Sequence, residues 1–178
     1  MEKNCIRILS IIFFVSLLPV LSFGIDSKDT RMLSQPAISQ NHIAFIYAED
    51  LWIANLDGSY PKRLTWHPGN DLVRGFTPDG KSVLFASQRS TFSGRYFQLF
   101  TVSLDGGFPV KLDIPNGWFA AYSPDGKQLA YSPLVPVYQQ WKHYRGGTIS
   151  RIWLYTFADH SVATIPQPKG GCNDADPM

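Results

Sequence analysis

Downstream of residue 34 the chain alternates short apolar runs with polar clusters. The runs are rich in β-branched and aromatic side chains; examples are Ile43–Tyr47, Val83–Ser87 and Leu129–Ser132. Short runs of this composition, bounded by Gly, Pro and Asp, are typical of β-strands. No stretch beyond the N-terminal segment has apolar residues at the 3.6-residue period of a helix. The pattern therefore predicts an all-β fold.

The polar clusters between the runs have the composition of tight turns. Pro-Asp-Gly occurs at 78–80 and 124–126, and Asp-Gly at 57–58 and 105–106. Pro sets φ for the second position of a turn, Asp bonds to following backbone amides, and Gly accepts positive φ. We therefore expect antiparallel hairpins: the Pro-Asp-Gly turns join first and second strands, and the Asp-Gly turns join third and fourth strands.

The same order of runs and turns recurs three times, at about 35–66, 72–113 and 117–165. A repeat of roughly 40–45 residues is typical of a β-propeller, in which each repeat is one four-stranded antiparallel blade. The prediction is a partial propeller over residues 35–178, with three blades and about half of a six-bladed ring. An aromatic residue stands at the same place in each third strand, at Trp52, Phe100 and Trp153. We expect these three to fill the space between neighbouring sheets and not to form a ligand cage.

The end of the sequence looks like the start of another repeat. A linker rich in Pro and Gly, Pro166–Gly171, leads into 173–178, which is expected to begin a fourth blade. Closed propellers have about four to eight blades, so three would leave open faces, and the chain is expected to be truncated. Alternatively, three blades from another copy could close the ring as a dimer, although exposed strand edges favour aggregation.

The first 24 residues have the pattern of a secretory signal peptide. Lys3 and Arg7 precede an apolar run from Ile8 to Leu21, and small residues precede a cleavage position after Gly24. The prediction is an exported chain, periplasmic or secreted, with a lead-in at 25–34. An uncleaved N-terminal anchor is the alternative. After cleavage a single cysteine, Cys172, remains, so no intrachain disulfide is expected.

Composition and motifs exclude several functions. The 178 residues carry a formal net charge of +2 with no long basic run, which disfavours nucleic-acid binding. Neither a His-Glu-x-x-His metal motif nor a Gly-rich phosphate loop is present, so no metal site and no cofactor are expected. The four histidines, His42, His67, His143 and His160, are scattered and stand near no nucleophile motif. No catalytic residue is predicted in this chain.

The connection between the second and third strands grows along the chain and is longest in the third repeat, over 133–150. Loops of this length in compact all-β proteins are usually functional or disordered. Aromatic and basic side chains gather in this one, which suits binding of a peptide or protein segment. The candidate binding residues are Trp141, Lys142, His143, Tyr144 and Arg145. Packing of these aromatics against an adjoining blade is the alternative.

These motifs resemble a known family. The Ser/Thr-Pro-Asp-Gly turns are similar to those of WD40-like propellers in secreted and periplasmic proteins. The segment 141–148, the opening from Pro36 to Trp52 and the ending 173–178 are similar to the N-terminal propeller of tricorn and tricorn-like serine peptidases. The resemblance implies a large multidomain enzyme that forms hexamers, whose first propeller filters or channels peptides. The family's catalytic residues belong to regions that have no counterpart in these 178 residues.

Two functions are therefore expected. In the first, the chain is the N-terminal propeller fragment of an exported tricorn-like serine peptidase. It would serve substrate access and scaffolding, with peptides and the remaining peptidase domains as partners, and would not be catalytic alone. In the second, it is a non-enzymatic periplasmic protein-binding propeller similar to the Tol translocation component.

Overall fold

The computed structural model describes residues 32–90, 96–134, 141, 146–147, 149–167, 169, 174 and 177. The chain divides into a unit of residues 1–30 and a unit of residues 31–178, and every described residue belongs to the second. Strands and turns make up this described part, which contains no helix, so the all-β prediction is confirmed. Over the same residues no helix is long and apolar enough to span a membrane. The signal peptide at 1–24 and residues 25–31 of the lead-in lie outside the described residues.

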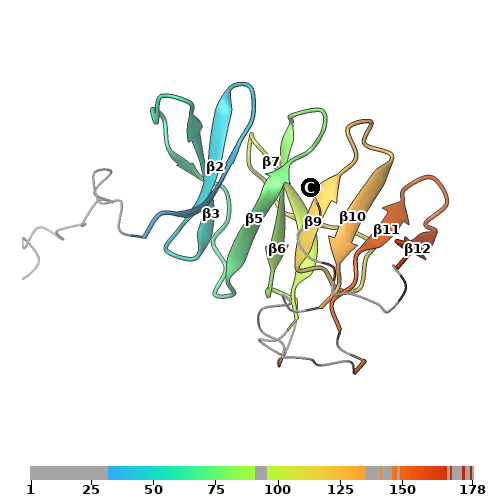
Figure 1. The fold of residues 1–178 in the computed structure, drawn as a ribbon. Coiled ribbons are helices and arrows are strands. Elements are labelled where there is room, and N and C mark those ends of the chain that lie inside the picture. The colour runs from blue at the N-terminus through green and yellow to red at the C-terminus, as the bar shows by residue number, and fades with distance from the viewer. Residues whose placement is uncertain are drawn as a thin grey trace, which may run out of the picture. The chain divides into compact units, whose positions relative to one another are not determined.

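In the described part of the chain, twelve strands form three four-stranded antiparallel sheets, each in chain order (Figure 1). Sheet 1 contains β1 (Ser34–Ile38), β2 (His42–Tyr47), β3 (Asp50–Asn55) and β4 (Lys62–Arg63). Sheet 2 contains β5 (Asp71–Phe76), β6 (Ser82–Ser87), β7 (Gln98–Ser103) and β8 (Val110–Lys111). Sheet 3 contains β9 (Phe119–Tyr122), β10 (Gln128–Ser132), β11 (Trp153–Thr156) and β12 (Val162–Thr164). The expected number of sheets and strands is confirmed.

Side-chain hydrogen bonds stabilise the turns between first and second strands. In sheet 2 the Thr77 hydroxyl donates to Asp79 Oδ1 at 2.6 Å, and the same oxygen accepts the Lys81 N–H at 3.1 Å. Gly80 follows at φ 67°, a conformation that side chains disfavour. Sheet 3 repeats this arrangement at Ser123, Asp125 and Gly126. The predicted turn chemistry is therefore present in both sheets.

The sheets pack face to face through two apolar cores. Each sheet has two faces. We call the face on the side of the preceding repeat the leading face, and the opposite face the trailing face. The trailing face of sheet 1 and the leading face of sheet 2 make the first core, with Ala44, Ile46, Leu51 and Ile53 against Val73, Val83, Phe85, Phe100 and Val102. The trailing face of sheet 2 and the leading face of sheet 3 make the second, with Leu84, Ala86 and Leu99 against Leu129, Tyr131 and Tyr155.

The aromatic residues of the third strands differ in their surroundings. Phe100 lies in the first core and stacks on Phe85 with ring centroids 5.8 Å apart. Trp153 packs against the second core beside Tyr131. The prediction of a core role is confirmed for these two and is wrong for Trp52. Trp52 is only half-buried and belongs to neither core, because no described sheet lies against the leading face of sheet 1.

A buried polar cluster joins sheets 1 and 2. The Thr65 hydroxyl accepts the Leu51 N–H at 2.9 Å and donates to Asp71 Oδ2 at 2.6 Å. Arg89 Nη2 donates to both carboxylate oxygens of Asp71, at 3.0 and 2.9 Å, and its guanidinium lies 4.9 Å from the Phe85 ring centroid. Since Asp71 is 1% exposed, its charge is compensated within the protein.

Each link to the next repeat makes the same backbone contact. The N–H of Asp71 donates to Glu49 O at 3.1 Å, and the N–H of Gly117 donates to Phe97 O at 2.9 Å. Both acceptors lie at the connection between the second and third strands of the preceding sheet. Asp174 makes the third such contact, because its N–H donates to Ser150 O at 3.2 Å. The backbone contact of Asp174 with sheet 3 therefore matches those of Asp71 with sheet 1 and of Gly117 with sheet 2.

Candidate functional site

The site predicted from sequence falls mostly outside the described residues. Lys142, His143, Tyr144 and Arg145 lie there, and Trp141 is described and 84% exposed. Trp141 is thus placed on the surface, and the proposed cluster of five stays a prediction.

A second candidate is a hollow along the first strands. The first strands β1, β5 and β9 lie next to one another across the sheets (Figure 1). The hollow has a volume of about 470 Å³, which is within the usual size of small-ligand sites. It is lined by Gln35, Pro36, Ala37, Leu72, Val73, Arg74, Trp118 and Phe119. We call it the first-strand hollow.

Arg74 is the charged residue among the described residues that line this hollow, and it contacts Val73, Trp118 and Phe119. Its Nε donates to Trp118 O, its Nη1 donates to Val73 O at 3.2 Å, and its guanidinium lies 4.6 Å from the Phe119 ring centroid. Trp118 is itself held edge-on to Phe97, with ring centroids 4.4 Å apart. A positive charge beside half-buried aromatic side chains can bind carboxylates and apolar side chains together.

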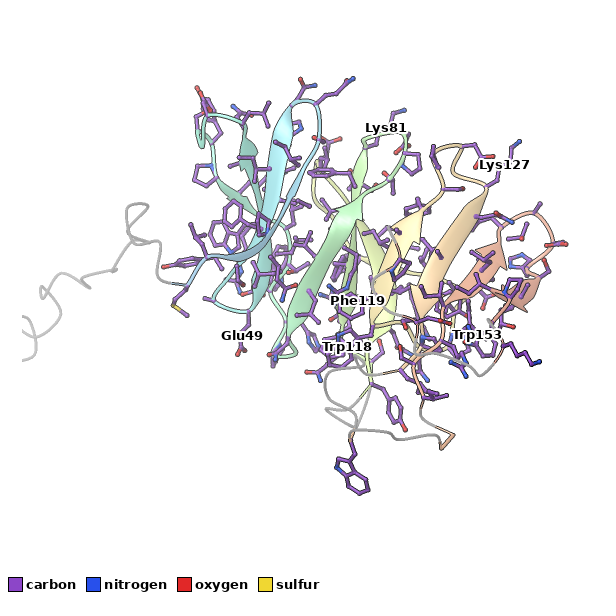
Figure 2. The ribbon with its side chains drawn as sticks, in the orientation of Figure 1. Glu49, Lys81, Trp118, Phe119, Lys127 and Trp153 are labelled. Atoms are coloured by element: carbon purple, nitrogen blue, oxygen red, sulfur yellow. The ribbon has the colours of Figure 1, made fainter. Side chains whose placement is uncertain are left out.

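Figure 2 shows how the labelled side chains are distributed. Lys81 and Lys127 extend from the turns between first and second strands, whereas Trp118 and Glu49 lie toward the opposite end of the strands. Trp118 is therefore at the end from which the predicted 133–150 connection leaves β10.

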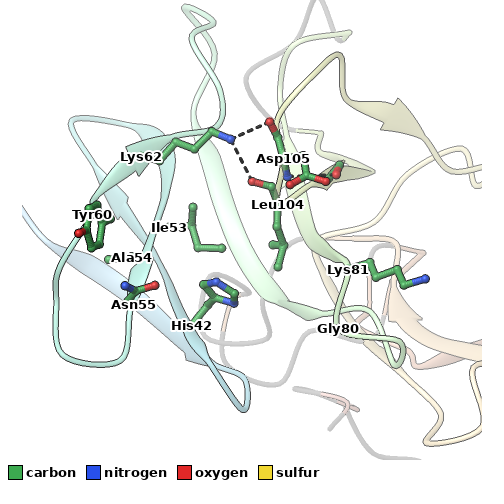
Figure 3. Close-up of a pocket in the computed structure, with 11 residues that line it drawn as sticks. His42, Ile53, Ala54, Asn55, Tyr60, Lys62, Gly80, Lys81, Leu104 and Asp105 are labelled. Carbon is green, nitrogen blue, oxygen red and sulfur yellow. Dashed lines mark hydrogen bonds between the residues drawn. The ribbon is translucent and has the colours of Figure 1, made fainter.

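A groove of about 480 Å³ separates sheets 1 and 2 at the other end (Figure 3). Lys62 crosses it and donates from Nζ to Leu104 O at 3.2 Å and Asp105 O at 2.6 Å. Tyr60 and Lys81 line the same groove and are exposed. The contacts of Lys62 join the two sheets. We therefore assign the side chain of Lys62 in this groove a structural role.

A third hollow, of about 490 Å³, lies between the first turns of sheets 2 and 3. The Thr77 hydroxyl lowers the pKa of Asp79 below its ordinary 3.8, and the Ser123 hydroxyl does the same for the pKa of Asp125. Burial and then the charge of Asp79 raise the pKa of Tyr122. Both carboxylates are thus stabilised as anions in turns, which does not suit proton transfer at neutral pH.

The described histidines make local contacts. His67 Nδ1 accepts the Gly69 N–H at 3.0 Å, and His160 Nδ1 lies 2.5 Å from the Tyr155 hydroxyl and 3.6 Å from Asp113 Oδ2. Across the described ranges, no group of three or more His, Cys, Asp or Glu side chains is arranged to hold a metal ion.

Reasoning from the sequence missed Arg74, Trp118 and Phe119. Their positions in the chain carry no motif, and they converge only because β5 and β9 are both first strands. Gly75 gives one local signal, because β5 has a bulge between Val73 and Gly75, which adopts φ 140°. A bulge redirects neighbouring side chains, but the sequence does not say toward what.

Comparison with known proteins agrees with this architecture. The family described as "Tricorn protease N-terminal beta propeller domain" matches residues 53–178. Tricorn protease homolog 1 of Streptomyces coelicolor is 33% identical over 135 residues, which is 72% of this chain and 12% of that protein. The Tol-Pal system protein TolB of Bordetella pertussis is 44% identical over 50 residues, covering 28% of this chain and 10% of that protein. The chain therefore spans only a small part of these relatives.

Solved structures share the fold. A putative TolB from Agrobacterium tumefaciens superposes with a TM-score of 0.59 at 20% identity, over 74% of this chain and 48% of that one. TolB from Acinetobacter baumannii superposes with a TM-score of 0.56 at 22% identity, over 76% of this chain and 33% of that one. At these identities the likeness concerns the fold alone.

Proposed function

Because this chain belongs to the family of tricorn protease N-terminal β-propeller domains, we propose that it is part of the first propeller of an exported serine peptidase. Its three sheets are three blades of that propeller, and residues 173–178 begin a fourth. Its role is to admit and hold peptides, while catalytic residues belong to other domains of the enzyme. The enzyme as a whole assembles from several copies.

The first-strand hollow is the observation that carries this proposal. The first strands of propeller blades surround a central channel, so β1, β5 and β9 would form part of its wall. Arg74 supplies positive charge there, and the described residues that line the hollow include no Asp or Glu. A peptide with a carboxylate next to an apolar or aromatic side chain would fit both features.

The contact of Asp174 supports the fourth blade. Asp71, the first residue of β5, and Gly117, two residues before β9, make the equivalent backbone contact. Asp174 Oδ2 also accepts from the Ile152 N–H at 3.3 Å and from Gln167 Nε2 at 2.7 Å. These contacts of Asp174 support a further first strand that begins near this residue.

Peptide binding by the purified chain tests the role in substrate access. A fluorescein-labelled hexapeptide ending in Phe-Asp, with a free C-terminal carboxylate, would be titrated and followed by anisotropy. We expect saturable binding that weakens about tenfold or more in Arg74→Ala, since a charge-assisted hydrogen bond contributes about 1.5–3 kcal/mol. The amidated Phe-Asn peptide should bind more weakly to the unchanged chain.

Lys127→Ala is the matched control. Lys127 is a cation whose side chain is 80% exposed and lies at the turn end, so its loss should leave binding unchanged. Arg74→Ala must keep the far-ultraviolet circular dichroism spectrum of the starting chain. Equal binding by all three proteins, or none by any, would contradict the proposal. Tight binding of a folded protein without peptide binding would favour a Tol-like adaptor.

A further inference from the structure

Arg74 enters the lining of the first-strand hollow as the extra residue of a bulge. β5 pairs Val73 with Phe85, and its next paired residue is Gly75, which lies opposite Leu84. Arg74 is therefore inserted between two regular pairs of the strand. A bulge bends its strand and changes the direction of the side chains around it, and Arg74 is one of the residues that line the hollow.

β1 has a bulge at the equivalent place of the repeat. Gln35 and Pro36 both lie opposite Phe45 of β2. Phe45 corresponds to Phe85 of β6, because each pairs with the aromatic residue of its third strand. Gln35 and Pro36 line the hollow as Arg74 does. The two bulges therefore insert residues into the same hollow.

The third first strand is regular at this place. Tyr131 of β10 is the residue of sheet 3 that corresponds to Phe45 and Phe85. It lies opposite one residue of β9, Ala120, and the register is unbroken over Phe119–Tyr122. The bulge is thus not a requirement of the repeat. It belongs to β1 and β5, which lie next to each other.

Gln35 is held in a backbone conformation that its residue type disfavours. Its φ is 51°, a value that residues other than glycine seldom adopt. Pro36 follows it, and the residue before a proline favours extended backbone. Glycine would form the same bulge with less strain, so the bulge does not explain why this residue is glutamine. Strained residues are concentrated where proteins bind ligands.

The carboxamide of Gln35 adds a second kind of polar group to the hollow. Its Oε1 accepts and its Nε2 donates hydrogen bonds, whereas the guanidinium of Arg74 can only donate. Within the described part of the chain no hydrogen bond engages this carboxamide. A peptide group, which has one N–H and one C=O, is the complement of a carboxamide.

We propose that Gln35 is a specificity-determining residue of the hollow, and that its carboxamide binds a main-chain peptide group while Arg74 binds the carboxylate of the same peptide. This inference rests on the peptide binding proposed above and narrows the class of ligand. The ligand is a peptide with a carboxylate and, near it in the chain, a free main-chain N–H. A proline or an N-alkylated residue at that position lacks the N–H and should be rejected.

An ester scan of the labelled hexapeptide ending in Phe-Asp tests the proposal on the full 178-residue chain. Each peptide of the set has one main-chain N–H replaced by an ester oxygen, and binding is followed by anisotropy. One replacement should weaken binding to the unchanged chain about two- to tenfold, the range of one neutral hydrogen bond. Gln35→Gly should weaken binding of the parent peptide by a similar factor and should bind the parent and that ester peptide equally.

The variants have matched controls. Gln35→Gly introduces a residue that adopts positive φ without strain, so it should keep the circular dichroism spectrum of the unchanged chain. Gln40→Gly removes an exposed glutamine from the turn that follows β1, and it should leave both binding and the ester difference unchanged. Arg74→Ala should weaken all the peptides alike and keep the ester difference.

The outcomes separate this proposal from the proposed function. Peptide binding that depends on Arg74 but is unchanged in Gln35→Gly would overturn the role of Gln35 alone. So would the lack of any ester difference in the unchanged chain, an equal ester difference in Gln35→Gly, or equal weakening by Gln40→Gly. A lack of peptide binding by the unchanged chain would overturn both.

Discussion

At the residue scale, close packing decides which side chains the sheet links accept. Gly117 lies in the link between sheets 2 and 3, where a Cβ atom would come within 2.5 Å of Leu99 Cγ. Leu99 is fully buried in the second core. The position therefore requires glycine because of space, and its N–H bond to Phe97 keeps the backbone there.

Gly117→Ala should destabilise the protein by about 1–3 kcal/mol, the usual cost of overpacking a core. Urea unfolding followed by circular dichroism would measure the change. Gly147→Ala is the matched control, because nothing lies within 4 Å of a Cβ placed there, and it should change the free energy of unfolding by less than about 0.5 kcal/mol. Equal stability of the two variants would show that Leu99 moves aside freely.

Because of the carboxylates in the turns, the free energy of unfolding should depend on pH in the acid range. Hydroxyl groups of Thr77 and Ser123 lower the pKa of Asp79 and Asp125 below the ordinary 3.8. A carboxylate with a lowered pKa in the folded state stabilises the fold above its unfolded pKa, and this contribution is lost as the pH falls through the folded pKa. The free energy of unfolding should therefore decrease as the pH falls from roughly 5 to 2.

The double variant Thr77→Val, Ser123→Ala should have a shallower decrease, because its two carboxylates lose their hydroxyl donors. Ser39→Ala is the control: Ser39 Oγ accepts the His42 N–H at 3.1 Å in the corresponding turn of sheet 1, where no Asp takes part. It should keep the full pH dependence. Parallel curves for the double variant and the unchanged chain would contradict this explanation.

At the element scale, the three sheets are held together by polar contacts as well as by apolar cores. The Asp71 and Arg89 pair is the most buried of these, with side-chain exposures of 0% and 12%. Because Asp71 begins β5 and Arg89 follows β6, the pair fixes both strands next to Thr65 of the preceding link. Sheet 2 is thereby aligned on sheet 1.

Asp71→Asn should destabilise the protein by about 3–5 kcal/mol, since it leaves the Arg89 charge without its buried partner. Chemical unfolding would measure this loss, and the second change Arg89→Met should recover part of it. Lys127→Met provides the comparison, because its pair with Asp125 is exposed and 3.8 Å long, and such pairs contribute about 0–1 kcal/mol. A loss below about 1 kcal/mol for Asp71→Asn would mean that water compensates Arg89.

The order of strands and the Asp-Gly turns could be predicted from the sequence, because alternating apolar runs and turn residues act locally. The turn at Ala48 and Glu49 could not be characterised in this way. Both residues adopt positive φ, 51° and 68°, although neither is Gly or Asn. Tertiary packing imposes this turn, since Glu49 O accepts the N–H of Asp71 from the next repeat.

The environment of Trp52 was also beyond prediction. Its place in the repeat equals that of Phe100, so the pattern assigned both to the core. Whether such a side chain is buried depends on a neighbouring sheet and not on its own strand. Its half-exposed state follows from its position at the start of the series.

At the scale of the whole molecule, one candidate site could be predicted from the sequence and the other could not. The connection at 133–150 could be singled out from its length and composition alone. The first-strand hollow could not, because Arg74 and Trp118 stand 44 residues apart and meet only when two sheets pack. The fold therefore identifies the first-strand hollow, whereas length and composition identify the 133–150 connection.

Photo-crosslinking tests whether peptides bind along the first strands. A peptide ending in Phe-Asp, with a diazirine on the residue before Phe, would be irradiated with the chain, and the adducts located by mass spectrometry. We expect adducts within 35–37, 72–74 and 118–119 that excess unlabelled peptide suppresses. Adducts confined to the groove of Tyr60, Lys62 and Lys81, or none that the unlabelled peptide suppresses, would contradict it.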